Sequence, residues 1–479
     1  MSTTASEEET SSLTGIMSEH EQLMWDMEKD PWLNPNGTGL VLLDKPVDME
    51  HFTARIRHAV AQEPALTQRV KEASTPLGRH SWAPDADFDL DRHLHHRTLE
   101  APGSERQLLD LATELYNEPL DRNHALWRFV VIDGLESGQG ALWLYTHHAL
   151  TDGIGQVEMS SHYYALSPDE PMMEPVDLDA VVAARVQAHG PTGSGPVLLR
   201  EAKRAAGEIL EDAREVAAEV MMWGADPRRI SDRLRDLQSA LRSTANQLTG
   251  SDGRPARGSE LWKHRSAQRH LEYASVDLAS LKASARSHGG SINDGFVAVM
   301  LEATSEYHEL NDASLDQVRA SFVLSTRKED TGLSNDFTPV VVAFSGGSLP
   351  WAERIGEVTS RIRVAREDAI ATGGVSAMAG AASSMPGSVI TRLARAHSAS
   401  IDFATSNIRG VPFPLYVSDS RVERVITQGP LAGTPCNATA MSTDGSFDVG
   451  LFTDPAAITD PALFRECVQR AFDSLVATG

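Results

Sequence analysis

The chain has 479 residues, with 67 acidic side chains against 43 basic ones and a formal charge of −24. Binding to nucleic acid needs a basic face that releases counterions from the phosphate backbone, so this charge argues against a nucleic-acid partner. The composition, 41% hydrophobic and 23% charged, is that of a folded globular protein long enough for two or three domains.

Three absences in the sequence bear on location. Cys436 and Cys467 are the only cysteines, too few for a disulfide framework or a thiolate metal site. Glu7, Glu8 and Glu9 stand where a signal peptide has positive charge followed by an apolar run. No uncharged stretch is hydrophobic enough to span a bilayer. We expect a cytoplasmic protein, with any attachment to the inner membrane face or to lipid droplets being peripheral.

Helix and strand patterns alternate in the first part of the chain. Residues 1–12 are polar and acidic, and we expect them to form a disordered tail. Apolar residues at helical intervals predict helices over 17–30, 49–61 and 108–118, and apolar runs predict strands over 39–43, 88–100, 126–135 and 141–148. This order predicts an α/β domain, layered in the α+β manner, over residues 13–180.

Residues 181–269 differ from the preceding segment in composition and in the spacing of apolar residues, and we predict a helical linker there. Residues 189–196 are rich in Gly, Pro and Ser, and apolar residues then recur every three or four positions up to Val220. The later segment Arg228–Arg269 carries ten basic and four acidic residues, a local balance of +6. A solvated helix and loop would explain this balance, and a contact with phosphates or lipid headgroups is the alternative.

Residues 270–479 again mix both kinds of element and are predicted to form a second domain. Helices are expected over 276–288, from 291 onward and over 462–477, and strands over 319–327, 338–346 and 446–454, with a turn-rich segment over 406–430. No copy of the polar motifs of the first half occurs here, so any duplication is structural only.

The heptad HHALTDG, from His147 to Gly153, follows the apolar strand over 141–148. Adjacent side chains at a strand end point to opposite faces, so one of His147 and His148 can reach a given pocket while the other braces the turn. Asp152 and Gly153 suit a tight turn whose carboxylate is held by a cation or by backbone donors. Zinc would need a third ligand and histidines that converge, so we predict no metal. A purely structural strand end is the remaining alternative.

Three further histidines lie in the predicted strand over 88–100. His93 and His95 share one face of that strand, and His96 lies on the other. Without a third ligand nearby, we expect exposed polar positions here rather than metal ligands.

HHALTDG and the preceding PLDRNHALW, residues 119–127, resemble the wax ester synthase/diacylglycerol acyltransferase family, a branch of the CoA-dependent acyltransferases. Other matching segments follow in order along the chain: MSEHEQLMWDMEKD, FDLDRHLHHRTLEAPG, SINDGFVAVM, LSTRKED, SNIRGVPFPLYVSDSRV and SFDVGLFTD. Two positions depart from the family pattern, since Ser334-Asn335 replaces the usual Gly-Asn and His124-Ala125 replaces Arg-Pro. These departures bear on which substrate the protein uses rather than on which reaction it catalyses.

The resemblance implies two chloramphenicol-acetyltransferase-like domains, joined by the helical crossover, with an active-site channel between them. It also implies a long-chain acyl-CoA as substrate, no cofactor, and synthesis of neutral lipid. The acceptor would be diacylglycerol, which yields triacylglycerol, or a fatty alcohol, which yields wax ester. Two alternatives stay open: an O- or N-acyltransferase of a secondary metabolite, and a lipid- or CoA-binding homologue without catalysis.

Ester formation requires a base for the hydroxyl proton, and an imidazole with a pKa near neutrality suits that task. The resemblance favours His148 as this base, with His147 as its support and Asp152 and Gly153 in the turn that holds the loop. The same resemblance places Asn293 near the reacting carbonyl, where its amide could donate to an oxyanion or orient His148.

Three more residues are expected to bind substrate or to act close to it. The resemblance implies that Glu28 lines the acceptor side, that Asp294 belongs to the Asn-Asp pair with Asn293, and that Arg327 is the candidate partner of the Asp152 carboxylate. Each has an ordinary alternative: a solvated helix charge for Glu28, a helix cap for Asp294, and a surface position for Arg327.

Overall fold

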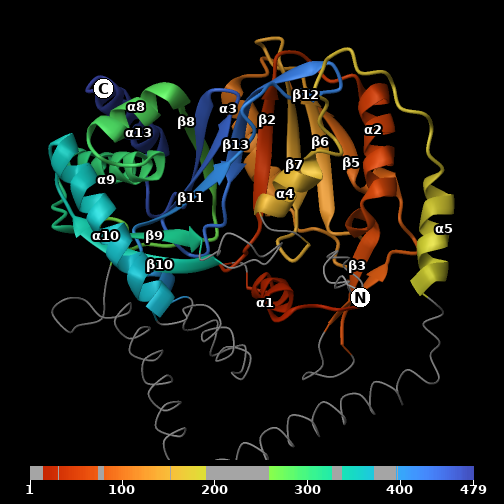
Figure 1. Cartoon of the computed structure of the whole chain (residues 1–479), viewed down its shortest axis with the longest axis horizontal. Helices are drawn as coiled ribbons and strands as arrows, with labels where there is room; N and C mark the ends of the chain where they lie inside the picture. Colours follow the sequence, from red (N-terminus) through yellow and green to blue (C-terminus); the bar gives the residue numbers. More distant parts are fainter. Residues whose placement is uncertain are drawn as a thin grey trace, which may run out of the picture.

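The computed structural model describes residues 15–30, 32–73, 80–150, 153–189, 258–325, 337–371, 395 and 397–479. Two halves stand side by side, each built on a six-stranded sheet (Figure 1). The predicted tail over 1–12 and residues 190–257 of the predicted linker lie outside the described residues.

The sheet of the N-terminal half has the strand order β12-β13-β2-β7-β6-β5. Its strands are β2 (Gly37–Leu43), β5 (Leu94–Thr98), β6 (Trp127–Asp133), β7 (Gly140–Thr146), β12 (Tyr416–Val417) and β13 (Ser420–Gln428). Neighbours are antiparallel except β5 and β6. A small sheet of β1 (Gly15–Ile16), β4 (Ser81–Pro84) and β3 (Gln68–Lys71) lies in the same half.

Strands β12 and β13 belong to the late part of the chain, yet they complete the N-terminal sheet. Thr427 of β13 lies opposite Gly39 of β2, so the late part of the chain contributes a strand pair to the N-terminal sheet (Figure 1). The predicted division at residue 270 therefore separates the sequence but not the sheets, because residues 416–428 cross back to the first sheet.

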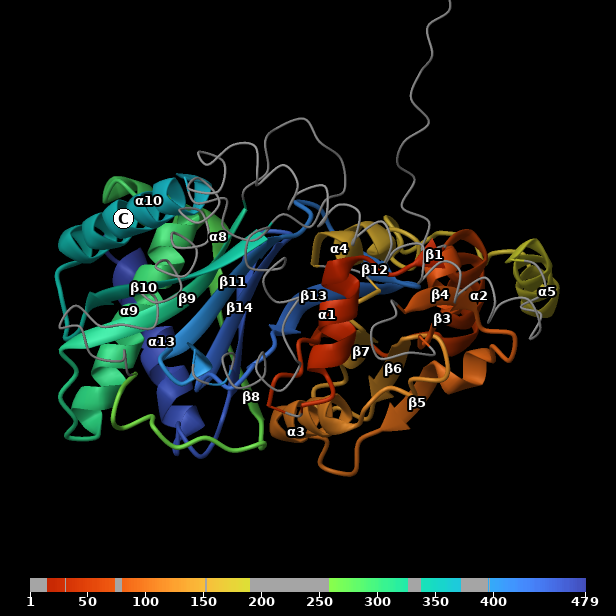
Figure 2. The ribbon, with the colours of Figure 1, turned by 90° about the horizontal axis from the view of Figure 1, so that it is seen from below.

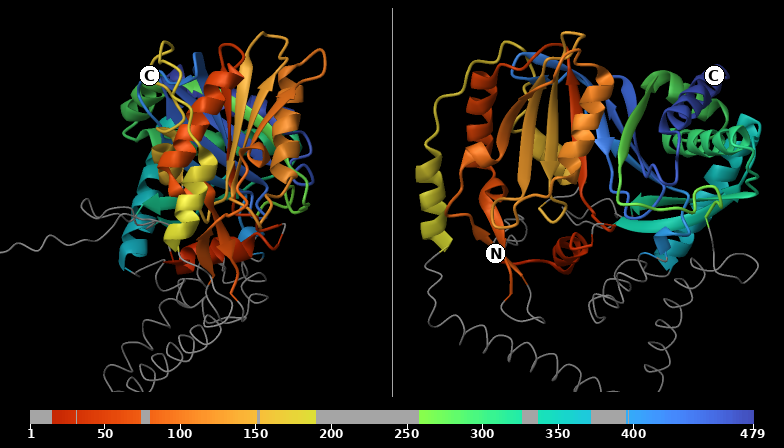
Figure 3. Two further views of the ribbon diagram at one scale, coloured as in Figure 1. Left: turned by 90° about the vertical axis from the view of Figure 1, so that its right-hand side faces the viewer. Right: turned by 180° about the vertical axis from the view of Figure 1, so that it is seen from behind.

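Helices cover both faces of the N-terminal sheet (Figure 3). They are α2 (Met49–Gln62), α4 (Gly153–Ser160) and α5 (Leu178–His189) on one side and α3 (Glu105–Asn117) on the other. The apolar stripe of α2 buries Phe52 and Ile56 against this sheet, and Asp48 caps its first turn. Arg185 of α5 donates to the carbonyl oxygens of Val60 and Ala61, at 2.9 and 2.7 Å. The predicted linker therefore begins after α5 rather than at residue 181.

The sheet of the C-terminal half has the order β10-β9-β11-β14-β15-β8. Its strands are β8 (His270–Asp277), β9 (Gln317–Ser325), β10 (Phe337–Ser345), β11 (Phe403–Arg409), β14 (Cys436–Thr443) and β15 (Ser446–Thr453), and its helices are α8 (Leu278–Ser287), α9 (Ile292–Leu310), α10 (Trp351–Ala371) and α13 (Pro461–Val476). Trp262 is fully buried in the core of this half. The predicted linker thus ends before residue 258, because residues 258–269 pack into the C-terminal half.

Some elements were absent from the sequence prediction. Strand β14, CNATAMST, has small and polar residues instead of an apolar alternation, and it is buried only because sheet neighbours flank it on both sides. Strand β8 lacks a clear alternation, and the short strands of the small sheet carry no pattern of their own. Within the described ranges, none of the helices is both long and apolar enough to span a membrane.

Candidate active site

The histidine loop begins at His147, directly after the last residue of strand β7, Thr146. The N–H of His147 donates to the carbonyl oxygen of Leu126, at 3.0 Å, and the N–H of Leu150 donates back to the carbonyl oxygen of His147, at 2.9 Å. Helix α1 (Glu19–Met27), begun by a Ser18–Glu21 capping box, lies below β7, as Figures 1 and 2 show. The loop is therefore enclosed between a strand end and a short helix.

His147 is fully buried and both of its ring nitrogens are engaged. The main-chain N–H of Ala149 donates to Nδ1 at 2.9 Å, so Nδ1 carries no proton. The proton is then on Nε2, which lies 3.1 Å from the Oε2 atom of Glu28 and donates to it. A ring held in one tautomer on both sides cannot also reach a substrate, and His147 braces the loop in this geometry.

His148 follows in the turn after β7, and its side chain is half-buried. Its main-chain N–H donates to Oδ1 of Asn36, at 2.8 Å. Asn36 is itself fully buried, and its Nδ2 donates to the Oε1 atom of Glu28 at 2.9 Å. One asparagine therefore connects the backbone of His148 to the carboxylate that holds His147.

Glu28 is the C-cap residue of α1, and three side chains bind its carboxylate. Besides His147 and Asn36, the Nη1 atom of Arg122 donates to Oε2 at 2.9 Å. Burial alone would raise the pKa of the Glu28 carboxyl. The hydrogen bond and electrostatic interaction with His147, the charge of Arg122 and the bond from Asn36 outweigh burial, so the pKa lies below its ordinary value. Glu28 is therefore a carboxylate at neutral pH.

Helix α9 carries Asn293 and Asp294 in its first turn, away from this cluster. Asp294 completes a capping box, because its Oδ2 atom accepts the N–H of Ser291 at 2.8 Å, which matches the helix-cap alternative. The turn before α9 packs against α10, where a Cβ at Gly290 would meet Ile355. In the described structure no hydrogen bond joins Asn293 to the histidine loop, so the proposed mechanism uses neither residue.

The remaining predicted residues are only partly placed. Gly153 is the first residue of α4. Asp152 and Arg327 lie outside the described residues, so their expected pairing stays a prediction.

The expectation of an exposed His93 was wrong. Residues Leu90–Arg92 form a short 3₁₀ turn that carries His93 into the core, where its side chain is 3% exposed and stacks between Phe88 and Trp127. Burial lowers its pKa to about 4, so the ring is neutral. His95 and His96 are partly or fully exposed, as expected. Across the described ranges, no three His, Cys, Asp or Glu side chains are arranged to hold a metal ion.

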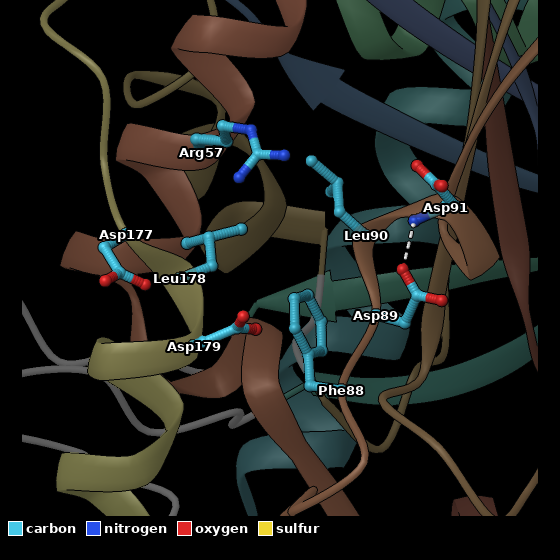
Figure 4. Close-up of a pocket in the computed structure, with 8 residues that line it drawn as sticks. All are labelled: Arg57, Phe88, Asp89, Leu90, Asp91, Asp177, Leu178 and Asp179. Atoms are coloured by element: carbon cyan, nitrogen blue, oxygen red, sulfur yellow. Dashed lines mark hydrogen bonds between the residues drawn. The ribbon is translucent and has the colours of Figure 1, made fainter.

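A pocket beside α2 and α5 has none of the predicted residues in its lining (Figure 4). It is surrounded by Arg57, two leucines, a phenylalanine and four aspartates. Two of these aspartates are already used by the backbone: Asp89 accepts the N–H of Asp91 at 3.1 Å, and Asp177 accepts the N–H of Ala180 at 3.0 Å. Those carboxylates shape turns, and the pocket is not the active site.

The sequence analysis missed two members of the cluster, Asn36 and Arg122. Sequence analysis could have found Arg122, because this residue lies inside the PLDRN segment that carried the family resemblance. Asn36 belongs to an Asn-Pro-Asn-Gly stretch, which is typical of a turn, and its role depends on β2 and β7 lying side by side.

Family comparison gives two consecutive matches. The model described as the wax ester synthase/diacylglycerol acyltransferase catalytic domain matches residues 17–296, and the C-terminal domain model of the same family matches residues 333–476. A putative diacylglycerol O-acyltransferase of Mycobacterium tuberculosis is 27% identical over 464 residues, covering 95% of this chain and 90% of that protein. A probable diacylglycerol O-acyltransferase of the same organism is 26% identical over 439 residues, covering 88% and 86%.

Solved structures agree in fold. The wax ester synthase/diacylglycerol acyltransferase from Marinobacter aquaeolei superposes with a TM-score of 0.61 at 17% identity, covering 96% of this chain and 98% of that one. The first condensation domain of the calcium-dependent antibiotic synthetase gives 0.57 at 14% identity, covering 97% and 96%. The expected pair of chloramphenicol-acetyltransferase-like halves is thereby confirmed. Because the catalytic-domain match alone covers more than half of its length, the chain belongs to the wax ester synthase/diacylglycerol acyltransferase family of acyltransferases.

Proposed function

We propose that the chain transfers a long acyl chain from CoA directly to the hydroxyl of a lipid, and that diacylglycerol is its principal acceptor, with fatty alcohol as a second one. The observation that carries this proposal is the division of labour between the two histidines. His147 is locked between Glu28 and the N–H of Ala149. The main-chain N–H of His148 donates to Asn36 of that same cluster, and its ring is half-buried.

In the proposed reaction, the imidazole of His148 takes the proton of the acceptor hydroxyl as the oxygen attacks the thioester carbonyl. A carbon–oxygen bond forms, the carbon–sulfur bond breaks, and the imidazolium returns its proton to the CoA thiolate. The products are an ester and free CoA, and no acyl-enzyme is formed. The preference for diacylglycerol rests on the names of the relatives and not on the geometry of an acceptor site.

The test is neutral-lipid synthesis by the purified protein with labelled palmitoyl-CoA and either diolein or hexadecanol. We expect His148→Ala to lower kcat by about 10²- to 10⁴-fold, because general base catalysis contributes that much. His96→Ala is the matched control, since His96 is an exposed histidine of the same half and is bonded to Asp133 at 2.7 Å. Equal activity of wild type and His148→Ala would contradict the proposal.

Two alternatives lead to other outcomes of the same assay. An acyltransferase of a secondary metabolite would release CoA only with other hydroxyl or amine acceptors, which an acceptor panel reveals. A homologue without catalysis would bind palmitoyl-CoA but release no CoA with any acceptor. The intact cluster of Glu28, Asn36 and the two histidines supports catalysis over binding alone.

We also propose peripheral contact with a membrane or lipid droplet, through two loops joined at one edge of the N-terminal half. Ala165 and Tyr416 pair in an antiparallel bridge, and beside them Leu166 is 67% exposed and Phe413 is 43% exposed. Single exposed apolar residues are ordinary on protein surfaces, and the pairing of these two loops is what distinguishes them. Replacing both residues by Asp should lower co-sedimentation with neutral-lipid emulsions, and unchanged sedimentation would remove these loops from the proposal.

A further inference from the structure

We propose that Arg122 is a positioning residue for acyl transfer. Its guanidinium keeps the Glu28 carboxylate where it accepts the Nε2 proton of His147, and it thereby holds the loop that presents His148. This inference deepens the proposed function and rests on it. Arg122 touches none of the reacting groups, and its effect on the reaction passes through Glu28.

Arg122 is held from three directions. Its guanidinium carbon lies 3.4 Å from the centre of the Trp25 ring, its Nη1 atom is 2.9 Å from Oε2 of Glu28, and its Nη2 atom is 3.2 Å from the carbonyl oxygen of Trp25. Trp25 is itself buried, and its Nε1 donates to Glu72 at 3.2 Å. A planar guanidinium that is stacked and bonded at two corners has little freedom to move.

The Oε2 atom of Glu28 accepts from both Arg122 and His147. The position of the guanidinium therefore sets the position of the oxygen to which His147 donates. At its other nitrogen His147 accepts the N–H of Ala149, the residue after His148. Movement of Glu28 would consequently be transmitted to both sides of His148 within three residues of chain.

Arg122 also supplies the positive charge of this cluster. The side chain of Glu28 is 10% exposed and that of Arg122 is 28% exposed, so their attraction is only partly screened by water. Without that cation, a buried Glu28 would bind a proton more readily and would present a hydroxyl to a neighbour that is itself a donor. Lysine would keep the charge but would lose the stacking on Trp25 and the second corner of the fork.

The experiment is a double-mutant cycle on kcat and KM with Arg122→Met, Glu28→Gln and the double variant. If Arg122 acts through Glu28, Arg122→Met lowers kcat by up to about 100-fold with KM for acyl-CoA unchanged. The double variant then equals Glu28→Gln alone. Arg122→Lys should recover part of kcat. All values are corrected for the folded fraction at the assay temperature, which circular dichroism measures.

Arg106→Met is the matched control. Arg106 binds Glu272 at 2.6 Å and the carbonyl oxygen of Leu271 at 3.0 Å, and the exposed fractions of its pair, 37% and 15%, are close to those of Arg122 and Glu28. We expect the kcat of Arg106→Met to stay near that of wild type. Additive effects of Arg122→Met and Glu28→Gln, or equal losses in Arg122→Met and Arg106→Met, would overturn the inference.

A second measurement does not depend on turnover. In protein labelled with ¹⁵N-histidine, the ring nitrogens of His147 should show the neutral Nε2–H tautomer in the wild type and in Arg106→Met, and a mixture of states in Arg122→Met. An unchanged His147 spectrum in Arg122→Met would overturn the positioning role. A wild type that makes no ester would refute the proposed function while leaving this spectral result interpretable.

Discussion

Two arginines, one in each half, satisfy their guanidinium groups in nearly the same way. Arg122 of the N-terminal half binds Glu28 and the carbonyl oxygen of Trp25. Arg354 of α10 binds Glu302 of α9 at 2.6 Å, Glu357 at 3.1 Å and the carbonyl oxygen of Ser345 at 2.7 Å.

The two networks differ in the next partner of the glutamate. Glu302 accepts from the hydroxyl of Ser348 and the N–H of Leu349, and Glu357 accepts from Ser345 and pairs with Arg361 at 2.9 Å. The network of Arg354 thus connects main chain, hydroxyl groups and a second arginine. Glu28 accepts instead from the ring of His147. The same ionic chemistry thus joins helices to a sheet edge in one half and orients a histidine loop in the other.

The largest effect is expected from Arg354→Met. Arg354 has no exposed side-chain surface, and its removal leaves the largely buried Glu302 without its cation, while Glu357 keeps Arg361 at 2.9 Å. Breaking a buried pair of this kind costs about 3–5 kcal/mol of unfolding free energy. Urea unfolding measures this loss, and kcat per folded molecule should be unchanged. If Arg354→Met kept its stability but lost kcat, the network of Arg354 would serve the reaction rather than the stability of the fold.

Gly450→Ala tests the place where the two sheets meet. A Cβ at Gly450 of β15 would overlap the main-chain oxygen of Thr427 in β13. Since main chain cannot move aside as a flexible side chain can, we expect a loss of about 1–3 kcal/mol in unfolding free energy. Gly39→Ala is the control on the facing strand β2, because a Cβ there meets only Leu144, at 4.0 Å. Equal losses in the two variants would place the strain elsewhere.

A third comparison concerns one buried carboxyl from each half. Burial raises the pKa of Asp402 to about 6, although the main-chain N–H groups of Ser259 and Arg319 and the charges of Arg265 and Arg319 oppose the shift. The pKa of Glu28 is lowered instead. The stability that Asp402 contributes is therefore present below its ordinary pKa of 3.8 and is lost as pH rises through about 6. The contribution of Glu28 is present above its ordinary pKa of 4.5 and is lost as pH falls.

Urea unfolding of Glu28→Gln and Asp402→Asn across this pH range separates the two carboxyls. Each unit of pKa shift corresponds to about 1.4 kcal/mol. The advantage of wild type over Glu28→Gln should shrink as pH falls below 4.5. Relative to Asp402→Asn, wild type should lose stability as pH rises from 3.8 to about 6. The same trend in both variants would contradict the opposite directions of the two pKa shifts.

The smallest expected effect is a gain in stability from Gly356→Ala. Gly356 is exposed in α10, two residues after Arg354, and a Cβ there meets nothing within 4 Å. Alanine restricts the unfolded chain and favours helix, so the unfolding free energy should rise by up to about 1 kcal/mol. Thermal unfolding checks this gain. A loss would mean that α10 needs glycine beside the Arg354 network.

Periodicity in the sequence predicted the main helices and several strands of both sheets, because amphipathic stripes such as that of α2 arise from burial of one face. It failed for β14, whose residues are too small and polar to show an apolar pattern, and for His93, which a single turn of 3₁₀ helix carries inward. The failure at β14 comes from sheet neighbours distant in sequence, which local patterns do not contain. The failure at His93 comes from a local turn that interrupts the expected strand alternation.

By itself, the sequence determined the family, the two-part fold and the two histidines at a strand end, since ordered motifs and local periodicity are written along one chain. The tertiary structure decided which histidine is locked, that β13 completes the first sheet, and that Glu28, Asn36 and Arg122 meet at one loop. The cluster requires groups up to 119 residues apart to come within hydrogen-bonding distance, and the pairing of β13 with β2 brings together residues up to 390 apart. Packing of helix α1 under the sheet brings the members of the cluster together, and no local pattern reports it.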